Sequence, residues 1–511
     1  MIGIVADDIT GANDIGTMFA KAGYVTHVYP LESFPPAPPQ RAFDGGSNPS
    51  FVGGSNSSFV GATDPASARE RPDVVVLDTA SRLDPPETAY AKAREATEKL
   101  RLAGASLWIN KTCSVFRGNV GPAFDAMLDA LGEPFAVVAL GFPKNGRTTV
   151  DGIHYVRGVP LERSEFRYDP VHPMTSSDLV EILRSQTSRP VERLGERTSA
   201  LRPERLRERL ELARSRGGYV ILDVESQRDL RTIARAVGRD YVLCGSSGLA
   251  EELAPLLRET PSATGDEGAP PAPGDEGAPP APGDEDAPSA PGSREAPPPP
   301  NVREGEAASR APSRDAFAPP PPLANVGILC VAGSLMPQTA LQIEALRAQG
   351  VPAFAFDPRE RLEAEDAWPE RAARLVDALC RELLAGRDAV LHTAYDPHIV
   401  AETKRLGAAR GWSGAETSRT VSETVAELAA AAVARTGQNR LLTAGGETSA
   451  AVCARLGIAG MRIWREIEPG LPSCVSLASP PMMLALKSGS FGSREFFRAA
   501  LEHLRGADTV L

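Results

Sequence analysis

The sequence opens with IGIVADDITGANDIGTMFAKAG at residues 2–23, a stretch with the pattern of one strand, one turn and one helix. Ile2–Ala6 is a short apolar run, and two acids, Asp7 and Asp8, follow it directly. Beyond them, apolar residues recur at helical spacing as far as Gly23. The segment therefore predicts a buried strand, an acidic turn at its carboxyl end and an amphipathic helix.

Short apolar runs alternate with longer amphipathic ones along the rest of the chain, which is typical of α/β domains with largely parallel sheets. Several runs end in a Gly- or Ser-rich turn, and such turns should lie at the carboxyl ends of strands, where open α/β sheets bind ligands. Besides the first, the expected strands are Val74–Leu77, Leu107–Asn110, Ala136–Leu140, Tyr219–Val224, Tyr241–Cys244, Gly327–Ala332, Ala389–His392, Leu441–Ala444 and Met483–Leu486.

Two low-complexity stretches interrupt this pattern, and both consist of tandem repeats with too little apolar surface for a packed core. The first contains FDGGSNPS, FVGGSNSS and FVGATDPA within residues 43–66, and the second repeats GDEGAPPAP from Gly265 to Pro291. Because 511 residues exceed what one core usually supports, we expect two α/β domains. These are residues 1–257, with an insert at about 35–70, and residues 324–511, joined by a disordered linker rich in Pro, Gly and Glu at 258–323.

The composition excludes several classes of partner. Residues 259–318 hold 12 acids and 4 arginines and so contribute −8 to the formal net charge of −11, yet the remainder lacks the basic surface that nucleic acids require. The six cysteines are scattered singly, which predicts buried, reduced thiols. No run is long enough to cross a bilayer, and the N-terminus lacks the basic region of a signal peptide. We therefore expect a cytoplasmic protein that binds neither nucleic acid nor membrane.

Asp7 and Asp8 admit two interpretations. Adjacent carboxylates at a strand end can hold Mg²⁺ or orient a hydroxyl for phosphoryl transfer, or one of them can simply cap the helix while the other is solvated. A receiver domain also has paired acids after its first strand, an Asp after its third and a late Lys, which Asp78 and Lys111 imitate. That class is disfavoured because Lys111 is not followed by Pro and the domain continues well beyond receiver length.

The segment Asn110–Gly121 combines two cations, Lys111 and Arg117, with hydroxyls and glycines in one turn-like stretch. Such a cluster suits a carboxylate or a phosphate, since Arg can form a bidentate pair and Lys acts as a point charge. A solvated basic loop is the alternative. Arg82, which follows another expected strand, is a second candidate for binding a carboxylate.

The C-terminal half has no GxxxxGK[ST] loop, so a nucleotide site there must use other glycine turns. Three turns follow expected strands: Gly333–Pro337, Gly445–Ser449 and Lys487–Gly492. Pro337 fits an early helix position, which leaves backbone N–H groups free for an anion. Lys487 either reaches a phosphate or is exposed. His392 and His398 lack further ligands at metal-binding spacing and are expected to be structural.

Seven segments together resemble the four-carbon acid sugar kinase family. They are ADDITGANDIGTMFAKAGY, DTASR, NKTCSVFRGNVG, GRTTVDGIHYVRGVPLERSEFRYDP, AGSLMPQT, AGGETSAAV and LALKSGSFG, and the resemblance covers nearly everything outside the two inserts. It implies that the N-terminal domain binds a sugar acid and the C-terminal domain binds ATP. Many members of the family carry Asp where this chain has Cys113.

The resemblance also implies roles for individual residues. Asp8 becomes the candidate catalytic carboxylate that orients the acceptor hydroxyl, and the substrate-binding candidates are Asp7, Arg82, Lys111, Ser114 and Arg117. The ATP-binding candidates are Ser334, Gly445, Gly446, Glu447, Thr448 and Gly489. ATP and Mg²⁺ are the implied cofactors, with no residue assigned to the metal.

The expected activity is transfer of phosphate from ATP to the terminal C4 hydroxyl of D-threonate or D-erythronate. The related acids 3-oxo-tetronate and L-threonate stay open as substrates, as does assembly into a homo-oligomer. The competing hypothesis from another class is a non-catalytic sensor that binds a sugar acid and a nucleotide.

Overall fold

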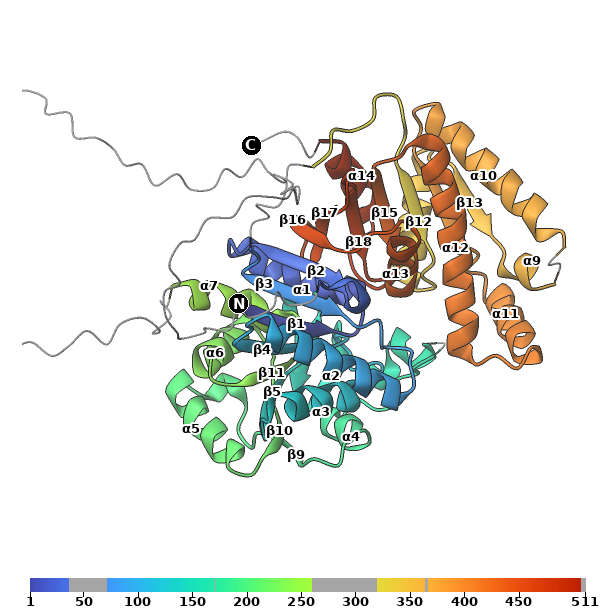
Figure 1. Ribbon diagram of the computed structural model, residues 1–511. Helices are drawn as coiled ribbons and strands as arrows, with labels where there is room; N and C mark the ends of the chain where they lie inside the picture. The colour runs from blue at the N-terminus through green and yellow to red at the C-terminus, as the bar shows by residue number, and fades with distance from the viewer. Residues whose placement is uncertain (36–70, 170, 260–318, 364–365, 507–511) are drawn as a thin grey trace, which may run out of the picture. The chain divides into compact units, whose positions relative to one another are not determined.

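The structure, a computed structural model, describes residues 1–35, 71–169, 171–259, 319–363 and 366–506 (Figure 1). The described residues before position 260 and those after position 318 form one compact unit. The predicted insert at about 35–70 lies almost wholly outside the described residues, and so does most of the predicted linker at 258–323.

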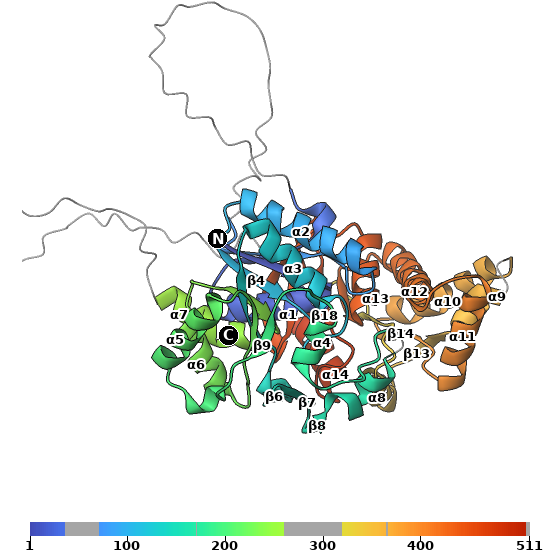
Figure 2. The same cartoon turned by 90° about the horizontal axis from the view of Figure 1, so that it is seen from below.

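The N-terminal half is an α/β domain in which parallel strands alternate with helices. Its strands are β1 (Ile2–Ala6), β2 (Thr26–Pro30), β3 (Val74–Asp78), β4 (Leu107–Lys111), β5 (Phe135–Ala139), β6 (Arg147–Val150), β7 (Ile153–Val156), β8 (Val159–Pro160), β9 (Val191–Arg193), β10 (Gly218–Ile221) and β11 (Val242–Gly245). Its helices are α1 (Ile9–Lys21), α2 (Pro86–Leu102), α3 (Val120–Leu131), α4 (Leu179–Arg184), α5 (Pro203–Arg214), α6 (Gln227–Val237) and α7 (Gly248–Glu259). Strands β6, β7 and β8 form a small separate sheet (Figure 2).

The C-terminal half is a second α/β domain. Its strands are β12 (Leu329–Ala332), β13 (Ala353–Phe356), β14 (Ala389–Thr393), β15 (Arg440–Ala444), β16 (Met461–Glu468), β17 (Leu471–Ser476) and β18 (Met483–Lys487). Its helices are α8 (Pro337–Ala348), α9 (Pro358–Glu363), α10 (Trp368–Leu384), α11 (Pro397–Ala409), α12 (Gly414–Thr436), α13 (Gly446–Arg455) and α14 (Phe496–Gly506).

The main strands form a 15-stranded sheet in the order β13-β14-β12-β15-β18-β17-β16-β2-β3-β1-β4-β11-β5-β10-β9. Pairing is parallel from β13 to β18 and again from β2 to β9. The antiparallel strands β17 and β16 join these two parallel parts. The prediction of two α/β domains with largely parallel sheets is therefore confirmed, while the joining hairpin was not predicted.

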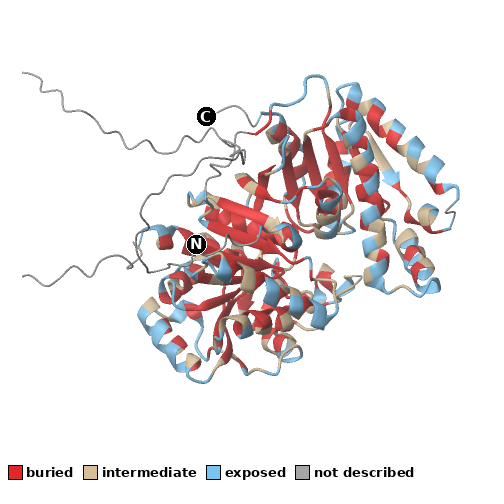
Figure 3. Ribbon diagram, viewed as in Figure 1, coloured by how far each residue is buried: buried red, intermediate tan, exposed pale blue. Residues whose placement is uncertain are grey.

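Helices cover both faces of each parallel part, and the strands between them are buried (Figure 3). In the N-terminal half, apolar side chains of α2, α3 and α4 share one core with the sheet, and those of α1, α5, α6 and α7 share the other. In the C-terminal half, α10, α12 and α13 lie over one face and α8 and α14 over the other. Because both faces are covered, most of the central strands read as continuous apolar runs in the sequence and were predicted, whereas the parallel strands β2, β9 and β13 were not.

The strand register places the predicted turns beside one another. Ala6, the last residue of β1, is level with Asp78 at the end of β3 and with Lys111 at the end of β4. In the C-terminal half, Ala444 at the end of β15 is level with Lys487 at the end of β18 and with Ala332 at the end of β12. The polar turns of each half thus meet at the carboxyl edge of its parallel strands, as predicted.

All six cysteines are buried and free, which confirms their predicted state. None of the helices that the structure describes combines the length and the apolar character needed to span a bilayer.

Candidate active site

A narrow pocket opens among these strand-end turns. Residues that follow β1, β3 and β4 line it from the N-terminal half, and the β16–β17 turn and the turn after β18 line it from the C-terminal half. Of the residues predicted to bind or act on the substrate, the pocket contains Asp8, Arg82, Lys111, Ser114 and Arg117. Lining residues that were not predicted to bind the substrate include Asp14, Cys113, Phe166, Gly470, Leu471, Ser488, Ser490 and Phe491.

Arg82 binds both acids of the opening turn. Its Nε and Nη2 atoms donate to the two carboxylate oxygens of Asp7 at 2.9 and 2.8 Å, and its Nη1 donates to Asp8 Oδ2 at 2.5 Å. Asp8 also caps α1, since its Oδ1 accepts from the Gly11 amide at 2.7 Å, and Thr10 Oγ1 donates to its Oδ2 at 3.0 Å. Asp8 is therefore both a helix cap and a member of the pocket.

The electrostatics of Asp8 favour its ionised form. Burial tends to raise the pKa of this carboxyl, but the charges of Arg82 and Lys111 oppose it, and the pKa lies below its ordinary value. Both carboxylate oxygens already accept hydrogen bonds from Gly11, Thr10 and Arg82. The group is thus a strong local anion and a poor proton acceptor.

Lys111 lies at the end of β4 with its side chain buried beside Asp14 of α1. Its Nζ is 3.6 Å from Asp14 Oδ2 and donates to the Thr112 carbonyl at 3.0 Å. Ser247, in the turn after β11, donates its hydroxyl to the same Oδ2. Burial raises the pKa of Asp14 to about 6, although Lys111 and Ser247 both act to lower it.

Arg117 forms the far side of the pocket. It donates through Nη1 to Asp169 at 2.5 Å and through Nε to the Cys113 sulfur at 3.3 Å, and its Cζ lies 5.1 Å from the centre of the Phe166 ring. Burial acts to raise the pKa of the Cys113 thiol, but Arg117 and Arg82 outweigh it and lower that pKa. The Cys113 thiol is thus more easily ionised than an ordinary cysteine.

Each cation of the pocket is already paired with a carboxylate, so an incoming anion needs donors that are still free. Among the described residues, Arg117 Nη2 and the Ser114 hydroxyl have no hydrogen-bond partner. Both belong to residues that line the pocket, and both can donate to a carboxylate or phosphate oxygen.

The three glycine turns of the C-terminal half converge. A Cβ at Gly333 would lie 2.0 Å from Thr448 Oγ1, one at Gly445 would lie 3.2 Å from the Ser334 amide, and one at Gly489 would lie 2.1 Å from Ser334 Oγ. The glycines are therefore required for this close packing. The predicted ATP residues Ser334, Gly445, Thr448 and Gly489 lie together in the structure.

The N-terminus of α13 reaches the acidic turn of the N-terminal half. A Cβ at Gly446 would lie 2.5 Å from Asp8 Oδ2 and 3.5 Å from Thr10 Oγ1. Glu447, the next residue, is exposed, and its carboxylate accepts from the Ser418 hydroxyl at 2.6 Å. Since the first amides of a helix attract anions, this end of α13 is a suitable phosphate site directly beside Asp8.

Side chains of helix α8 donate hydrogen bonds to backbone carbonyl groups of the turn after β18. Thr339 donates to the Gly489 carbonyl at 2.8 Å, Gln338 to that of Gly492 at 2.7 Å, and Gln342 to those of Phe491 and Ser493 at 3.2 and 2.7 Å. In a planar trans peptide, the carbonyl and the following amide point in opposite directions. The amides that follow, including those of Ser490 and Gly492, consequently point away from α8, as an anion-binding turn requires.

Lys487 is fully buried, so the alternative of an exposed lysine is wrong. Its ammonium group donates to Thr339 Oγ1 at 3.0 Å and to the Gly489 carbonyl at 2.9 Å. Burial lowers the pKa of Lys487 to about 7. In the structure, its hydrogen bonds hold the Gly489 turn in place.

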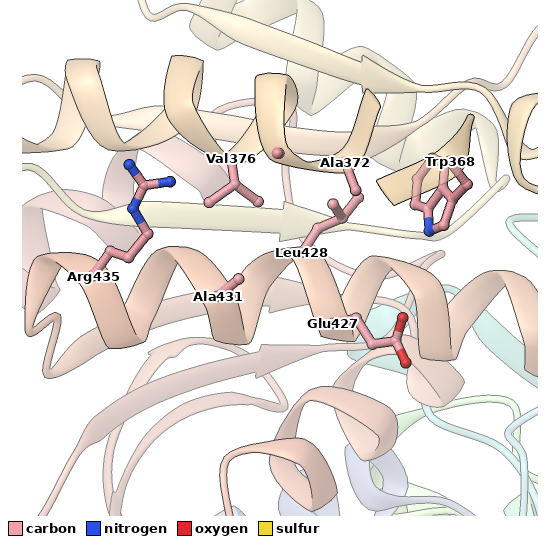
Figure 4. A pocket seen from close by; sticks show the side chains of 8 residues that line it. Trp368, Ala372, Val376, Glu427, Leu428, Ala431 and Arg435 are labelled. Carbon is pink, nitrogen blue, oxygen red and sulfur yellow. The ribbon is translucent and has the colours of Figure 1, made fainter. Parts of the chain in front are cut away.

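The remaining predictions concern residues outside the pocket. His392 is buried against Tyr395, with ring centres 5.4 Å apart, and His398 is exposed at the start of α11. The part of the chain that the structure describes contains no cluster of three or more His, Cys, Asp or Glu side chains placed to hold a metal ion. A second hollow, of about 260 Å³, lies between α10 and α12 and is lined by Trp368, Ala372, Val376, Leu428 and Ala431, among others (Figure 4).

Sequence reasoning missed four contributors to the site. Asp14 lies in the opening motif but was assigned no role. Ser247, which binds Asp14, and Thr339, which binds the Gly489 carbonyl, were not singled out in the sequence. Gly470 lies in the unpredicted β16–β17 hairpin. For Asp14, the acidic spacing within the first helix was the only available signal.

A pocket with free hydrogen-bond donors in one half lies beside glycine turns of the other half, and an enzyme that transfers a phosphoryl group to a small anion needs both kinds of site. Comparison with known proteins agrees. Residues 2–253 match the model of a sugar-binding N-terminal domain, and residues 329–497 match that of a nucleotide-binding C-terminal domain.

Two relatives are similar to this protein over almost the whole chain. A 3-oxo-tetronate kinase of Methylobacterium radiotolerans is 31% identical over 507 residues, covering 98% of each chain, and one of Pseudomonas fluorescens is 30% identical, covering 99% of this chain and 97% of its own. A solved Salmonella typhimurium protein, described as a putative tRNA synthase, superposes with a TM-score of 0.66 at 25% identity and covers 98% of each chain.

This chain belongs to the four-carbon acid sugar kinase family. It is an ATP-dependent kinase, and its acceptor is a four-carbon sugar acid. The prediction of an enzyme is thereby confirmed, and the sensor hypothesis loses its support.

Proposed function

We propose that the chain transfers the γ-phosphate of magnesium-bound ATP to the C4 hydroxyl of a four-carbon sugar acid held in the pocket described above. The observation that carries this proposal is the proximity of two kinds of anion site. Free donors on Ser114 and Arg117 line the same pocket as Ser488 and Ser490 of the turn after β18. A small acid and a triphosphate could therefore meet there.

At the acceptor end, Arg117 and Ser114 would bind the substrate carboxylate, and Lys111 and Arg82 would supply positive charge nearby. Asp7 would act through Arg82, because the bidentate hydrogen bond between them fixes the orientation of the guanidinium group. The predicted catalytic role of Asp8 stays a prediction. The hydrogen bonds of its carboxylate favour the task of holding Arg82 and facing the phosphates at Gly446.

At the donor end, Ser334, Gly445, Gly446, Thr448 and Gly489 would hold the phosphates mainly through backbone amides. Glu447, exposed at the start of α13, would lie at the edge of the nucleotide site. Mg²⁺, when bound, neutralises charge on the β- and γ-phosphates. This metal is usually held by one or two carboxylates together with the phosphates and water, so it requires no cluster of protein ligands.

The pocket must widen for substrate to enter. Its volume of about 20 Å³ is sufficient for little more than one water molecule. We infer that the β16–β17 turn and the turn after β18 move away from the acid-binding wall when the substrates enter and return around them. Such closure excludes water and so protects ATP from hydrolysis.

The identity of the acid is the finer part of the proposal. The two relatives compared above are named for 3-oxo-tetronate, whereas the sequence predicted D-threonate or D-erythronate. All three acids have a carboxylate at one end and a hydroxyl at the other, which is what the pocket recognises. We place 3-oxo-tetronate first among the candidates.

The test is ADP release in a coupled assay with saturating MgATP and a panel of 3-oxo-tetronate, D- and L-threonate, D-erythronate and longer aldonic acids. Turnover with one four-carbon acid, and a phosphorus–carbon coupling that places the new phosphate on C4, are the expected results. Folded protein that releases no ADP with any member of the panel would overturn the proposal.

Three further expectations stay predictions. We propose that residues 1–257 form the acid-binding domain and residues 324–511 the nucleotide-binding domain, in agreement with the matched models. A cytoplasmic location and assembly into a homo-oligomer remain to be measured.

A further inference from the structure

Asp14 is the pocket carboxylate with a free oxygen. The residue lies in the second turn of α1, is 4% exposed and lines the pocket. Its Oδ2 is held by the Ser247 hydroxyl and faces Lys111 at 3.6 Å. Its Oδ1 is shielded from solvent and has no hydrogen-bond partner among the described residues. One oxygen thus fixes the orientation of the group and the other is left to accept a proton.

The β16–β17 turn covers this free oxygen. Gly470 has a φ of +75°, and a Cβ there would lie 2.5 Å from Asp14 Oδ1. Only glycine can approach so closely without a clash. When this turn moves to admit a substrate, Oδ1 becomes the oxygen that faces the bound acid.

Asp14 is well suited to accept a proton, whereas Asp8 is not. Asp8 has both oxygens occupied and a pKa below its ordinary value. Asp14 has a free oxygen, and burial raises its pKa to about 6 against the effect of Lys111. General bases work best when their pKa lies near the working pH, because they are then both ionised and basic.

We propose, building on the kinase function proposed above, that Asp14 is the general base of the reaction and that Ser247 and Lys111 position it. The acceptor hydroxyl gives its proton to Asp14 Oδ1 as its oxygen forms a bond to the γ-phosphorus of ATP. The bond from that phosphorus to the bridging oxygen breaks, and its electron pair leaves with ADP. After product release, Asp14 loses the proton to solvent.

Several charged groups set the titration of Asp14. They face it from its own helix, from the neighbouring strand and turns, and from the covering hairpin. The nearest cation is Lys111 of β4, and the nearest anion is Asp8 at the start of α1. Charged groups farther along the elements packed against Asp14 are paired with other residues: Arg82 with Asp8, Glu466 of β16 with the Gly470 amide at 2.9 Å, and Lys21 of α1 with Glu251 and Glu466.

The first test compares wild type with Asp14→Asn and Asp8→Asn, measuring kcat and both KM values from pH 5 to 8.5. General-base catalysis typically contributes about 10²–10⁴-fold. Asp14→Asn should lower kcat by about a hundredfold or more and leave both KM values within a few-fold. It should also remove the acid limb of the pH–rate profile, which is the fall in kcat as the pH drops through about 6. Asp8→Asn should keep that limb and chiefly raise KM. An Asp14→Asn enzyme with more than a tenth of the wild-type kcat would overturn the proposal.

Ser247→Ala provides a second test that does not depend on Asp14→Asn folding. The substitution removes a donor to Asp14 Oδ2, so the pKa of Asp14 should rise and the acid limb should move to higher pH. If the acid limb came from titration of the nucleotide, or if Asp14 only anchored Lys111, Ser247→Ala would leave the limb at the wild-type pH. That result would refute the assignment of Asp14 as the base. Circular dichroism and calorimetric ATP binding report whether each variant is folded.

The outcomes separate the two proposals. If wild type releases no ADP with any acid of the panel, the proposed function fails. If wild type is active while Asp14→Asn keeps its rate or Ser247→Ala keeps its limb, the function stands and the role of Asp14 fails.

Discussion

Lys487 should make the stability of the protein depend on pH in a way that a single substitution removes. It is a fully buried cation at the end of β18, and its hydrogen bonds go to neutral oxygens of Thr339 and Gly489. Within the described chain, no carboxylate lies within ion-pairing distance of its ammonium group. The folded state therefore favours the neutral amine.

The size of the effect follows from linkage. Burial lowers the pKa of Lys487 to about 7, whereas an unfolded lysine titrates near 10.4. Between these values the unfolded state binds more protons, so the free energy of unfolding rises with pH. From pH 7 to 8.5 the gain should be about 1.5 kcal/mol. Below about pH 7 the penalty for keeping the buried group charged is fully present.

Lys487→Met keeps the length of the side chain and removes the titration. Urea unfolding followed by tryptophan fluorescence, at pH 7 and at pH 8.5, gives the free energy of unfolding of each protein. Other titrating groups contribute equally to both proteins, so the difference between their pH dependences isolates Lys487. Lys404→Met, at an exposed position on α11, is the matched control. An equal pH dependence in wild type and Lys487→Met would refute the reasoning.

Three further results are expected. Gly489→Ala should weaken ATP binding about tenfold or more by calorimetry, because the new Cβ would lie 2.1 Å from Ser334 Oγ; unchanged affinity would place the phosphates elsewhere. Arg82→Lys cannot reproduce the bidentate bond to Asp7, so the KM for the acid should rise about tenfold or more while the KM for ATP changes little. Chelation by EDTA should abolish ADP release and Mg²⁺ should restore it, whereas turnover that persists without divalent metal would contradict the phosphoryl-transfer scheme.

The fold was largely predictable because both faces of each parallel sheet are covered. Strands such as Phe135–Ala139 and Leu329–Ala332 are buried from end to end, and they appear as unbroken apolar runs. One strand that was not predicted lacks such a run. Met461–Glu468 pairs with β17 along its length but with β2 only at Met461 and Arg462, so most of it has a neighbouring strand on one side only. It mixes charged and apolar residues, and it was not predicted as a strand.

The turns of the site were predictable for a different reason. Glycines at 333, 445 and 489 mark places where atoms of Thr448 or Ser334 lie too close to leave room for a Cβ, and the glycines themselves are visible in the sequence. The partner that each glycine accommodates was not. Gly446, for example, faces Asp8 from a distance of more than 400 residues along the chain.

Roles that depend on partners from distant segments could not be predicted. Asp8 and Asp14 belong to one motif, six positions apart on one helix and its cap, and sequence reasoning chose Asp8 because it follows the strand. Arg82, from the turn after β3, then occupies Asp8 and lowers its pKa. Ser247, from the turn after β11, holds only one oxygen of Asp14, which burial leaves with a raised pKa. Two neighbouring carboxylates are thus given different chemistry by residues about 70 and more than 230 positions away, and the proton should go to the one whose partners leave an oxygen free.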